Sequence, residues 1–159
     1  MRGASTPDPN RRRAVTSLGD RVLREGWAAK ESRHWGSWRL RWLVLHHELD
    51  TGIPVLATYR SARPTWELGN EPKPTERLHL VGATCFRCPD DVSMASNRPH
   101  AFTVNIRGRD FVFANEAAKE MEAWVRSISM SLAELALRLG GVETGALSQP
   151  TSPSYAAFM

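Results

Sequence analysis

Cysteine and long apolar runs are scarce in this sequence of 159 residues. Two cysteines do not make the disulfide framework that holds small secreted domains together. The longest apolar run, residues 42–45, falls far short of the roughly 20 residues that a bilayer-spanning helix needs. The N-terminus carries charge and proline but no apolar segment like that of a signal peptide, and there is no Asn-X-Ser/Thr site. We therefore expect a cytoplasmic protein.

Signatures of catalysis and of metal binding are also missing. The sequence contains no Gly-X-Gly-X-X-Gly, Gly-X-Ser-X-Gly or His-Glu-X-X-His pattern. Asp90 and Asp91 are adjacent carboxylates without a third partner, and we interpret them as solvated turn residues. Cys85 and Cys88 have the spacing of half a zinc site, but such positions point to opposite faces of a strand and no second pair follows. We expect neither an enzyme nor a cofactor or metal.

Positive charge is concentrated in the first quarter of the chain. Residues 1–41 contain ten Lys or Arg and four Asp or Glu, a net charge of +6. The remaining residues contain 11 Lys or Arg and 13 Asp or Glu, a net charge of −2. Such an asymmetry indicates an anionic partner for the N-terminal part. Nucleic acid is one possible partner, but the aromatic stacking platform of sheets that bind single strands is not recognisable. We therefore expect no nucleic-acid binding.

Short strand signals dominate the middle of the chain. Runs rich in β-formers predict seven strands, over residues 26–29 (preceded by Val22 and Leu23), 38–46, 53–59, 77–81, 84–87, 102–106 and 109–113. Arg107 and Gly108, between the last two, indicate a tight hairpin turn. Residues 61–74 and 90–99 are predicted to be loops.

The pattern then changes to that of an amphipathic helix. Apolar residues recur every three or four positions, at Met121, Trp124, Val125, Ile128, Leu132, Leu135 and Leu139. Asn115 is predicted to cap this helix, and Gly140 with Gly141 to end it. We interpret residues 1–20 as a disordered basic tail, residues 21–140 as one domain and residues 141–159 as a flexible tail.

Seven strands followed by a helix with a central tryptophan resemble the pleckstrin homology (PH) domain family, over roughly residues 21–139. The similarity rests on Glu25-Gly26-Trp27, on Trp-Arg-Leu-Arg-Trp-Leu-Val-Leu at 38–45, on Val-Leu-Ala-Thr-Tyr-Arg-Ser at 55–61 and on Glu122-Ala-Trp124. The resemblance implies an α+β, mainly β fold: a seven-stranded antiparallel barrel or sandwich capped by one C-terminal helix. It implies that Trp124 plugs one open end, and we expect Trp27 and Trp42 to be packing residues too.

The resemblance extends to the members of the family that bind phosphoinositide headgroups. These carry a lysine late in strand one and Arg/Lys-X-Arg in strand two, which here correspond to Lys30 and Arg39-Leu40-Arg41. Residues 39 and 41 of a strand share one face. Arginine offers phosphate bidentate hydrogen bonds and lysine a compact charge. Arg33, in the loop between strands one and two, and Arg109, at the start of strand seven, are expected to assist in binding the headgroup.

Two departures argue against strong selectivity for one headgroup. Thr58 stands where many trisphosphate-binding relatives have a tyrosine, and the turn at Arg107 and Gly108 is short. The sequence thus predicts a monomeric, non-enzymatic module that binds phosphoinositides in anionic membranes and targets the protein to their cytosolic face. The alternative is a PH-fold scaffold for protein interaction, which uses a sheet edge or the loop that contains Trp66.

Overall fold

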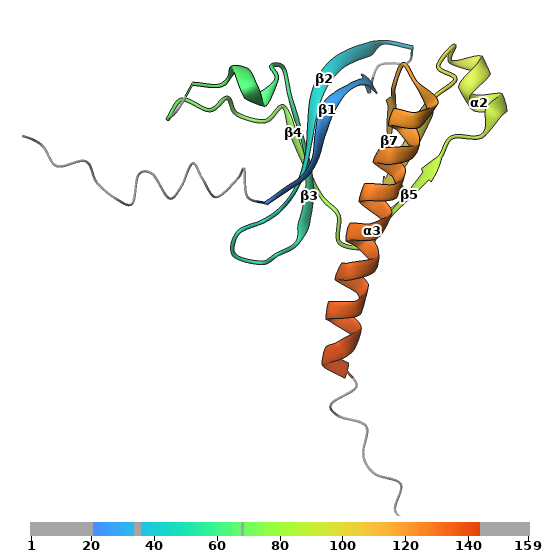
Figure 1. Ribbon diagram of the computed structural model, residues 1–159. Coiled ribbons are helices and arrows are strands. Elements are labelled where there is room, and N and C mark those ends of the chain that lie inside the picture. The colour runs from blue at the N-terminus through green and yellow to red at the C-terminus, as the bar shows by residue number, and fades with distance from the viewer. Residues whose placement is uncertain (1–20, 34–35, 68, 144–159) are drawn as a thin grey trace, which may run out of the picture.

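The computed structural model describes residues 21–33, 36–67 and 69–143, so most of both predicted tails lies outside the described residues. Seven antiparallel strands form one sheet of order β4-β3-β2-β1-β7-β6-β5, and helix α3 (Ala118–Glu143) lies across its open side (Figure 1). The strands are β1 (Val22–Glu31), β2 (Trp38–His47), β3 (Pro54–Tyr59), β4 (Glu76–His79), β5 (Ala83–Arg87), β6 (Ala101–Ile106) and β7 (Arg109–Ala114). The predicted fold class is confirmed.

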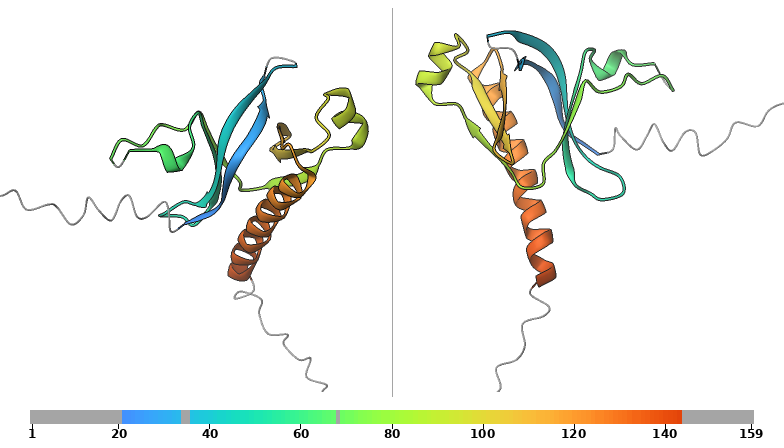
Figure 2. Two further views of the ribbon diagram at one scale, coloured as in Figure 1. Left: turned by 45° about the horizontal axis from the view of Figure 1, so that its top comes forward. Right: turned by 180° about the vertical axis from the view of Figure 1, so that it is seen from behind.

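The sheet is divided into two halves that meet between β1 and β7. That ladder contains only two residue pairs, Ala29 with Ala114 and Lys30 with Phe113. The two views in Figure 2 show the halves on either side of α3. Strands β4 and β5 stand at the two ends of the sheet order and do not pair within the described part of the chain. The sheet is therefore not closed, and the word barrel describes it only loosely.

Helix α3 fills the opening between the two halves. Trp124, Met121 and Ile128 of the helix are fully buried. Both halves of the sheet contribute to the same core, with Leu43, Leu45, Leu56, Phe102 and Phe113. A large aromatic side chain removes the most apolar area from water at such a position. The predicted role of Trp124 as a plug is thus confirmed.

The helix extends further than predicted. It continues through Gly140 and Gly141 to Glu143, so the prediction that these glycines end it is wrong. Glycine costs a helix only about 1 kcal/mol relative to alanine, and it ends a helix mainly where it adopts a positive φ. Gly140 does not adopt one. The distal turns project past the sheet (Figure 1), which explains why Leu139 is exposed and not part of the buried stripe.

Three smaller predictions are also corrected. Asn115 precedes the start of α3 and does not cap it; its side-chain amide instead donates to the carbonyl of Trp27, 3.1 Å away. The predicted loop at 90–99 contains a short helix, α2 (Asp90–Ala95). Trp27 is 42% exposed and meets Trp42 edge-on, with ring centroids 5.4 Å apart, so it is only partly a packing residue.

The loop between β3 and β4 is held against the sheet. It contains a 3-10 turn, η1 (Arg63–Thr65), whose Arg63 forms two hydrogen bonds of 2.6 Å with the carboxylate of Glu25 on β1. Within the described residues, no helix combines the length and the apolar character needed to cross a bilayer.

Candidate functional site

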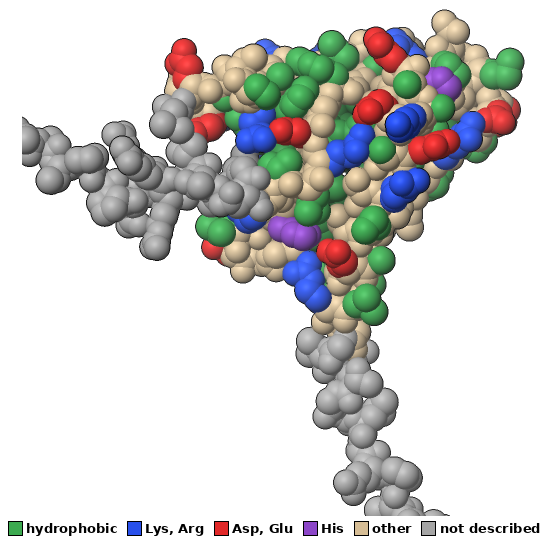
Figure 3. Space-filling model, viewed as in Figure 1, with side chains coloured by type: hydrophobic (Ala, Val, Ile, Leu, Met, Phe, Trp, Pro, Cys, Tyr) green, Lys and Arg blue, Asp and Glu red, His purple; other side chains and the backbone are tan. Residues whose placement is uncertain are grey.

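A cavity of about 380 Å³ lies at the loop end of the β1–β2 hairpin, next to the end of β3 and the start of β4. Five basic side chains surround it together with a few hydroxyl and acidic groups; its lining consists of Lys30, Glu31, Ser32, Arg33, Arg39, Arg41, Arg60, Thr75 and Glu76. On the face of the molecule that carries α3, by contrast, acidic and basic side chains are interspersed (Figure 3). The cavity is thus a local concentration of positive charge.

Strand register explains why these side chains converge. Lys30 on β1 stands opposite Arg39 on β2, so their side chains share the face that Arg41 also occupies. Further along the same face of β2, Leu43 and Leu45 enter the core. Arg39 and Arg41 therefore lie on the same face of β2 as these leucines, where the strand leaves the hydrophobic core.

The cavity places its positive charges close enough to affect one another. Burial, followed by the charges of Arg41, Arg33, Arg109 and Arg39, lowers the pKa of Lys30 to about 8. The carboxylate of Glu76 forms an ion pair with Lys30 and acts in the opposite direction, because it stabilises the ammonium.

Arg41 is the second cavity-lining residue whose pKa is lowered. Burial, and then the charges of Arg39 and Arg60, lower the pKa of Arg41. Mutual repulsion of this kind favours an anion that bridges several of these groups at once.

Arg109 lies beside the cavity and not in its lining. Its guanidinium carbon is 4.6 Å from the ring centroid of Phe111, and the ammonium of Lys30 is 5.9 Å from the same centroid. The structure therefore brings together four of the five predicted site residues, Lys30, Arg33, Arg39 and Arg41, with Arg109 as a neighbour.

The family model described as PH domain matches residues 22–133 of this chain. The chain belongs to the PH domain family. No curated protein sequence matches it. The solved structures similar to this PH domain include the C-terminal PH domain of human pleckstrin, with a TM-score of 0.55 and 16% identity over 70% of this chain and 88% of that one.

Two further similar structures are complexes. The C-terminal PH domain of pleckstrin in complex with D-myo-Ins(1,2,3,4,5)P5 has a TM-score of 0.51 and 16% identity, over 69% of this chain and 97% of that one. The Slm1-PH domain in complex with phosphoserine has a TM-score of 0.55 and 17% identity, over 70% of this chain and 96% of that one. At these identities the likeness shows the shared PH fold.

Among the residues that line the cavity, Arg60, Thr75 and Glu76 lie outside the β1–β2 hairpin and were not predicted from the sequence. Arg60 follows the end of β3, and the β2–β3 ladder, continued by one pair beyond Trp42 and Tyr59, places it opposite Arg41. Arg60 belongs to the segment 55–61 that resembles a PH-family motif, and this resemblance could have indicated it. Thr75 and Glu76, by contrast, reach the cavity only because β4 pairs with β3, and no local pattern indicates this.

The position of Thr58 has a structural explanation. Thr58 is fully buried, and its hydroxyl lies 2.7 Å from that of Thr75. Thr58 is not among the cavity-lining residues. The hydroxyl of Thr75 donates to the carbonyl of Thr58 over 3.1 Å, which connects β3 to the residue before β4.

The loop between β1 and β2 is also partly ordered by backbone contacts. The amide of Ser32 donates to the carbonyl of Ser37 over 2.8 Å, and Gly36 adopts a φ of +80°, which glycine accommodates without strain. Residues 34 and 35 of this loop are outside the described residues.

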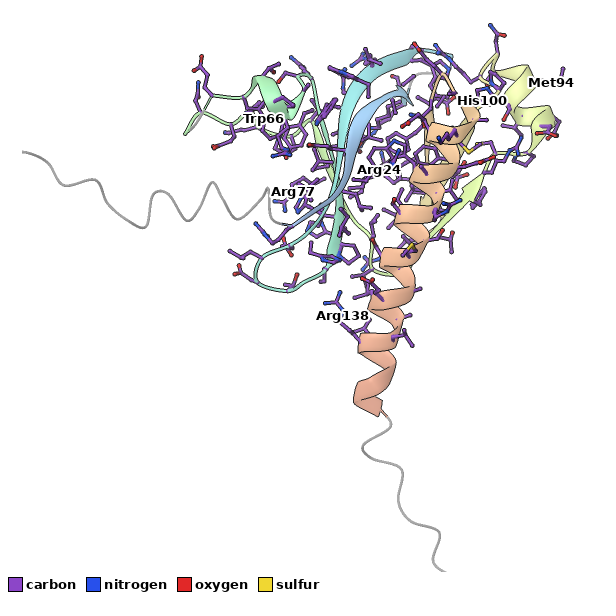
Figure 4. The ribbon with its side chains drawn as sticks, in the orientation of Figure 1. Arg24, Trp66, Arg77, Met94, His100 and Arg138 are labelled. Carbon is purple, nitrogen blue, oxygen red and sulfur yellow. The ribbon has the colours of Figure 1, made fainter. Side chains whose placement is uncertain are left out.

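The loop that contains Trp66 does not present this ring as a free docking group. Trp66 packs on Tyr59 with ring centroids 4.5 Å apart, and its indole nitrogen donates to the carbonyl of Ser61 over 3.2 Å. Figure 4 labels Trp66 in the loop between β3 and β4. A second cavity, of about 560 Å³, lies on the other side of the hairpin beside Trp27 and Leu40. Its lining includes Arg98, Glu116 and Glu120, so it has no excess of positive charge.

Proposed function

We propose that this PH domain binds the phosphorylated headgroup of a phosphoinositide in the cavity at the β1–β2 hairpin and thereby attaches the protein to the cytosolic face of a membrane. One observation carries the proposal: Lys30, Arg33, Arg39, Arg41 and Arg60 converge on a single hollow of about 380 Å³. An inositol phosphate presents several phosphate groups in a small volume, which matches such a cluster.

The chemistry assigned to each group follows from its type and place. Arg39 and Arg41, adjacent on one face of β2, supply paired donors to neighbouring phosphates. Lys30 supplies a point charge near the loop end of the hairpin, and Arg33 and Arg60 add two more guanidinium groups to the lining of the cavity. Phosphate-bearing ligands in the solved complexes of pleckstrin and Slm1 support a ligand of this class. The protein acts as a monomeric, non-enzymatic binding module.

Vesicle co-sedimentation tests this function. Phosphatidylcholine–phosphatidylserine vesicles with and without phosphoinositide are compared for the wild type, Arg41→Ala and Arg126→Ala. Arg126 is exposed on α3 and outside the cavity, so its substitution removes the same charge elsewhere. We expect Arg41→Ala to weaken phosphoinositide-dependent binding about tenfold, since a hydrogen bond to a charged group contributes roughly 1.5–3 kcal/mol.

Two outcomes contradict the proposal. In the first, the wild type binds phosphoinositide vesicles no better than vesicles with phosphatidylserine alone. In the second, Arg41→Ala and Arg126→Ala weaken binding equally and salt abolishes it, which leaves only surface electrostatics. Either result favours the alternative role in protein interaction.

A further inference from the structure

Two carboxylates, Glu31 and Glu76, are among the residues that line the cavity, and that of Glu76 is paired with a basic group. The carboxylate of Glu76 forms an ion pair with the ammonium of Lys30, and the two side chains are only 19% and 21% exposed. Arg33, Arg39 and Arg60, which line the same cavity, have no carboxylate partner among the described residues. Glu76 thus neutralises one basic group and leaves the others available.

Glu76 is held in this position by the backbone around it. It is the first residue of β4 and stands opposite the buried Thr58 of β3. The preceding residue, Thr75, donates its amide to the carbonyl of Thr58 over 2.7 Å, and the two hydroxyls are also 2.7 Å apart. These contacts fix the backbone next to Glu76, and its side chain is only 19% exposed.

The surroundings of Lys30 explain why a fixed carboxylate is needed there. Burial and the neighbouring guanidinium groups act against the charged form of Lys30 and lower its pKa. A nearby anion compensates this cost. In the protein without ligand, the anion that does so is the carboxylate of Glu76.

We propose that Glu76 is an internal competitor for the phosphate that Lys30 would bind, so that a ligand must displace the Glu76–Lys30 ion pair to occupy the cavity fully. The inference rests on the proposed function and adds a rule for selectivity. A phosphate monoester carries a charge of about −1.5 to −2 near neutral pH and outcompetes a single carboxylate. Phosphatidylserine has no phosphate monoester, so Glu76 excludes it from Lys30.

Substitution of Glu76 by glutamine tests the proposal. The change keeps the shape of the side chain and removes its charge. The matched control is Glu122→Gln, which removes one charge from an exposed position on α3. Binding is measured with phosphatidylcholine vesicles containing either a phosphoinositide or phosphatidylserine, and soluble inositol 1,4,5-trisphosphate is titrated separately to distinguish a free headgroup from a membrane lipid. Thermal melts establish that each variant is folded.

We expect Glu76→Gln to tighten phosphoinositide binding about fivefold and to raise phosphatidylserine binding by a larger factor, while Glu122→Gln changes neither. In a Lys30→Met background the gain from Glu76→Gln should vanish, because the competition requires both partners.

The possible failures can be told apart. If the wild type binds and Glu76→Gln binds equally well or more weakly, Glu76 is not a competitor and the proposed function still stands. A gain of the same size from Glu122→Gln reduces the effect to net charge and overturns the inference. If neither the wild type nor Glu76→Gln binds any of these probes, the proposed function itself is overturned.

Discussion

The guanidinium of Arg24 on β1 lies over the indole ring of Trp124 on α3, with its central carbon 5.2 Å from the ring centroid. The same guanidinium donates to the carboxylate of Glu120 over 2.9 Å. Figure 4 shows Arg24 between β1 and the helix. The contact joins α3 to β1, the strand that also supplies Lys30 to the cavity.

Replacing Trp124 by alanine is expected to destabilise the domain by about 3–5 kcal/mol, the usual range for removal of a buried tryptophan. The cause is the loss of a fully buried ring at the junction of both halves of the sheet. Trp27→Ala makes the same chemical change at a ring that is 42% exposed and should cost about 1 kcal/mol. Urea unfolding measures both, and equal losses would contradict the plug role of Trp124.

The bidentate pair between Glu25 and Arg63 predicts a pH-dependent contribution to stability. The hydrogen bonds from Arg63 hold the pKa of Glu25 below its ordinary value of 4.5. A carboxyl whose pKa is lowered by folding stabilises the folded state above its unfolded pKa, and this contribution is lost as the pH falls through the lowered value.

The corresponding experiment is urea unfolding of the wild type and Glu25→Gln at a series of pH values. Because both side chains are partly exposed, we expect a difference of about 1 kcal/mol at neutral pH. The difference should shrink toward zero in acid. A difference that does not vary with pH would show that the ion pair is not its source.

The β6–β7 turn contains two consecutive residues with positive φ, Arg107 at 52° and Gly108 at 79°. Gly108→Ala should destabilise the domain by about 1 kcal/mol, because alanine is strained in this conformation. No atom lies within 4 Å of the added methyl group, so the cost is conformational and not steric. The control Gly140→Ala, in α3, should instead stabilise slightly. Thermal denaturation of both variants tests the difference in sign.

The two cysteines are expected to react slowly in the folded protein. Burial, with a smaller contribution from Cys88, raises the pKa of Cys85 to about 12. Burial also raises the pKa of Cys88, whose sulfur lies 3.2 Å from the hydroxyl of Thr103. Since the thiolate is the reactive form, a disulfide reagent at pH 8 should label both thiols rapidly only in denaturant. Rapid labelling of the native domain would show that these thiols ionise more readily.

Local patterns predicted much of the fold. The run of β-formers at residues 38–46 predicted β2. The two-residue period of a strand then predicted the common face of Arg39 and Arg41. The three- and four-residue spacing of Met121, Trp124 and Ile128 predicted α3 and its buried face. The end of α3 was predicted wrongly, because Gly140 continues the helix without a positive φ. The exposure of Leu139 was not predicted either, because it depends on where the sheet stops.

For the candidate site, the sequence by itself determined the basic residues of the hairpin. Lys30, Arg39 and Arg41 lie close together along the chain, and strand pairing alone brings them onto one face. Only the tertiary structure decided which carboxylate faces Lys30. Glu76 follows Lys30 by 46 positions and reaches it because β4 pairs with β3 at the far side of β2. Charge interactions depend on distance in space, and strand order, not sequence spacing, determines that distance.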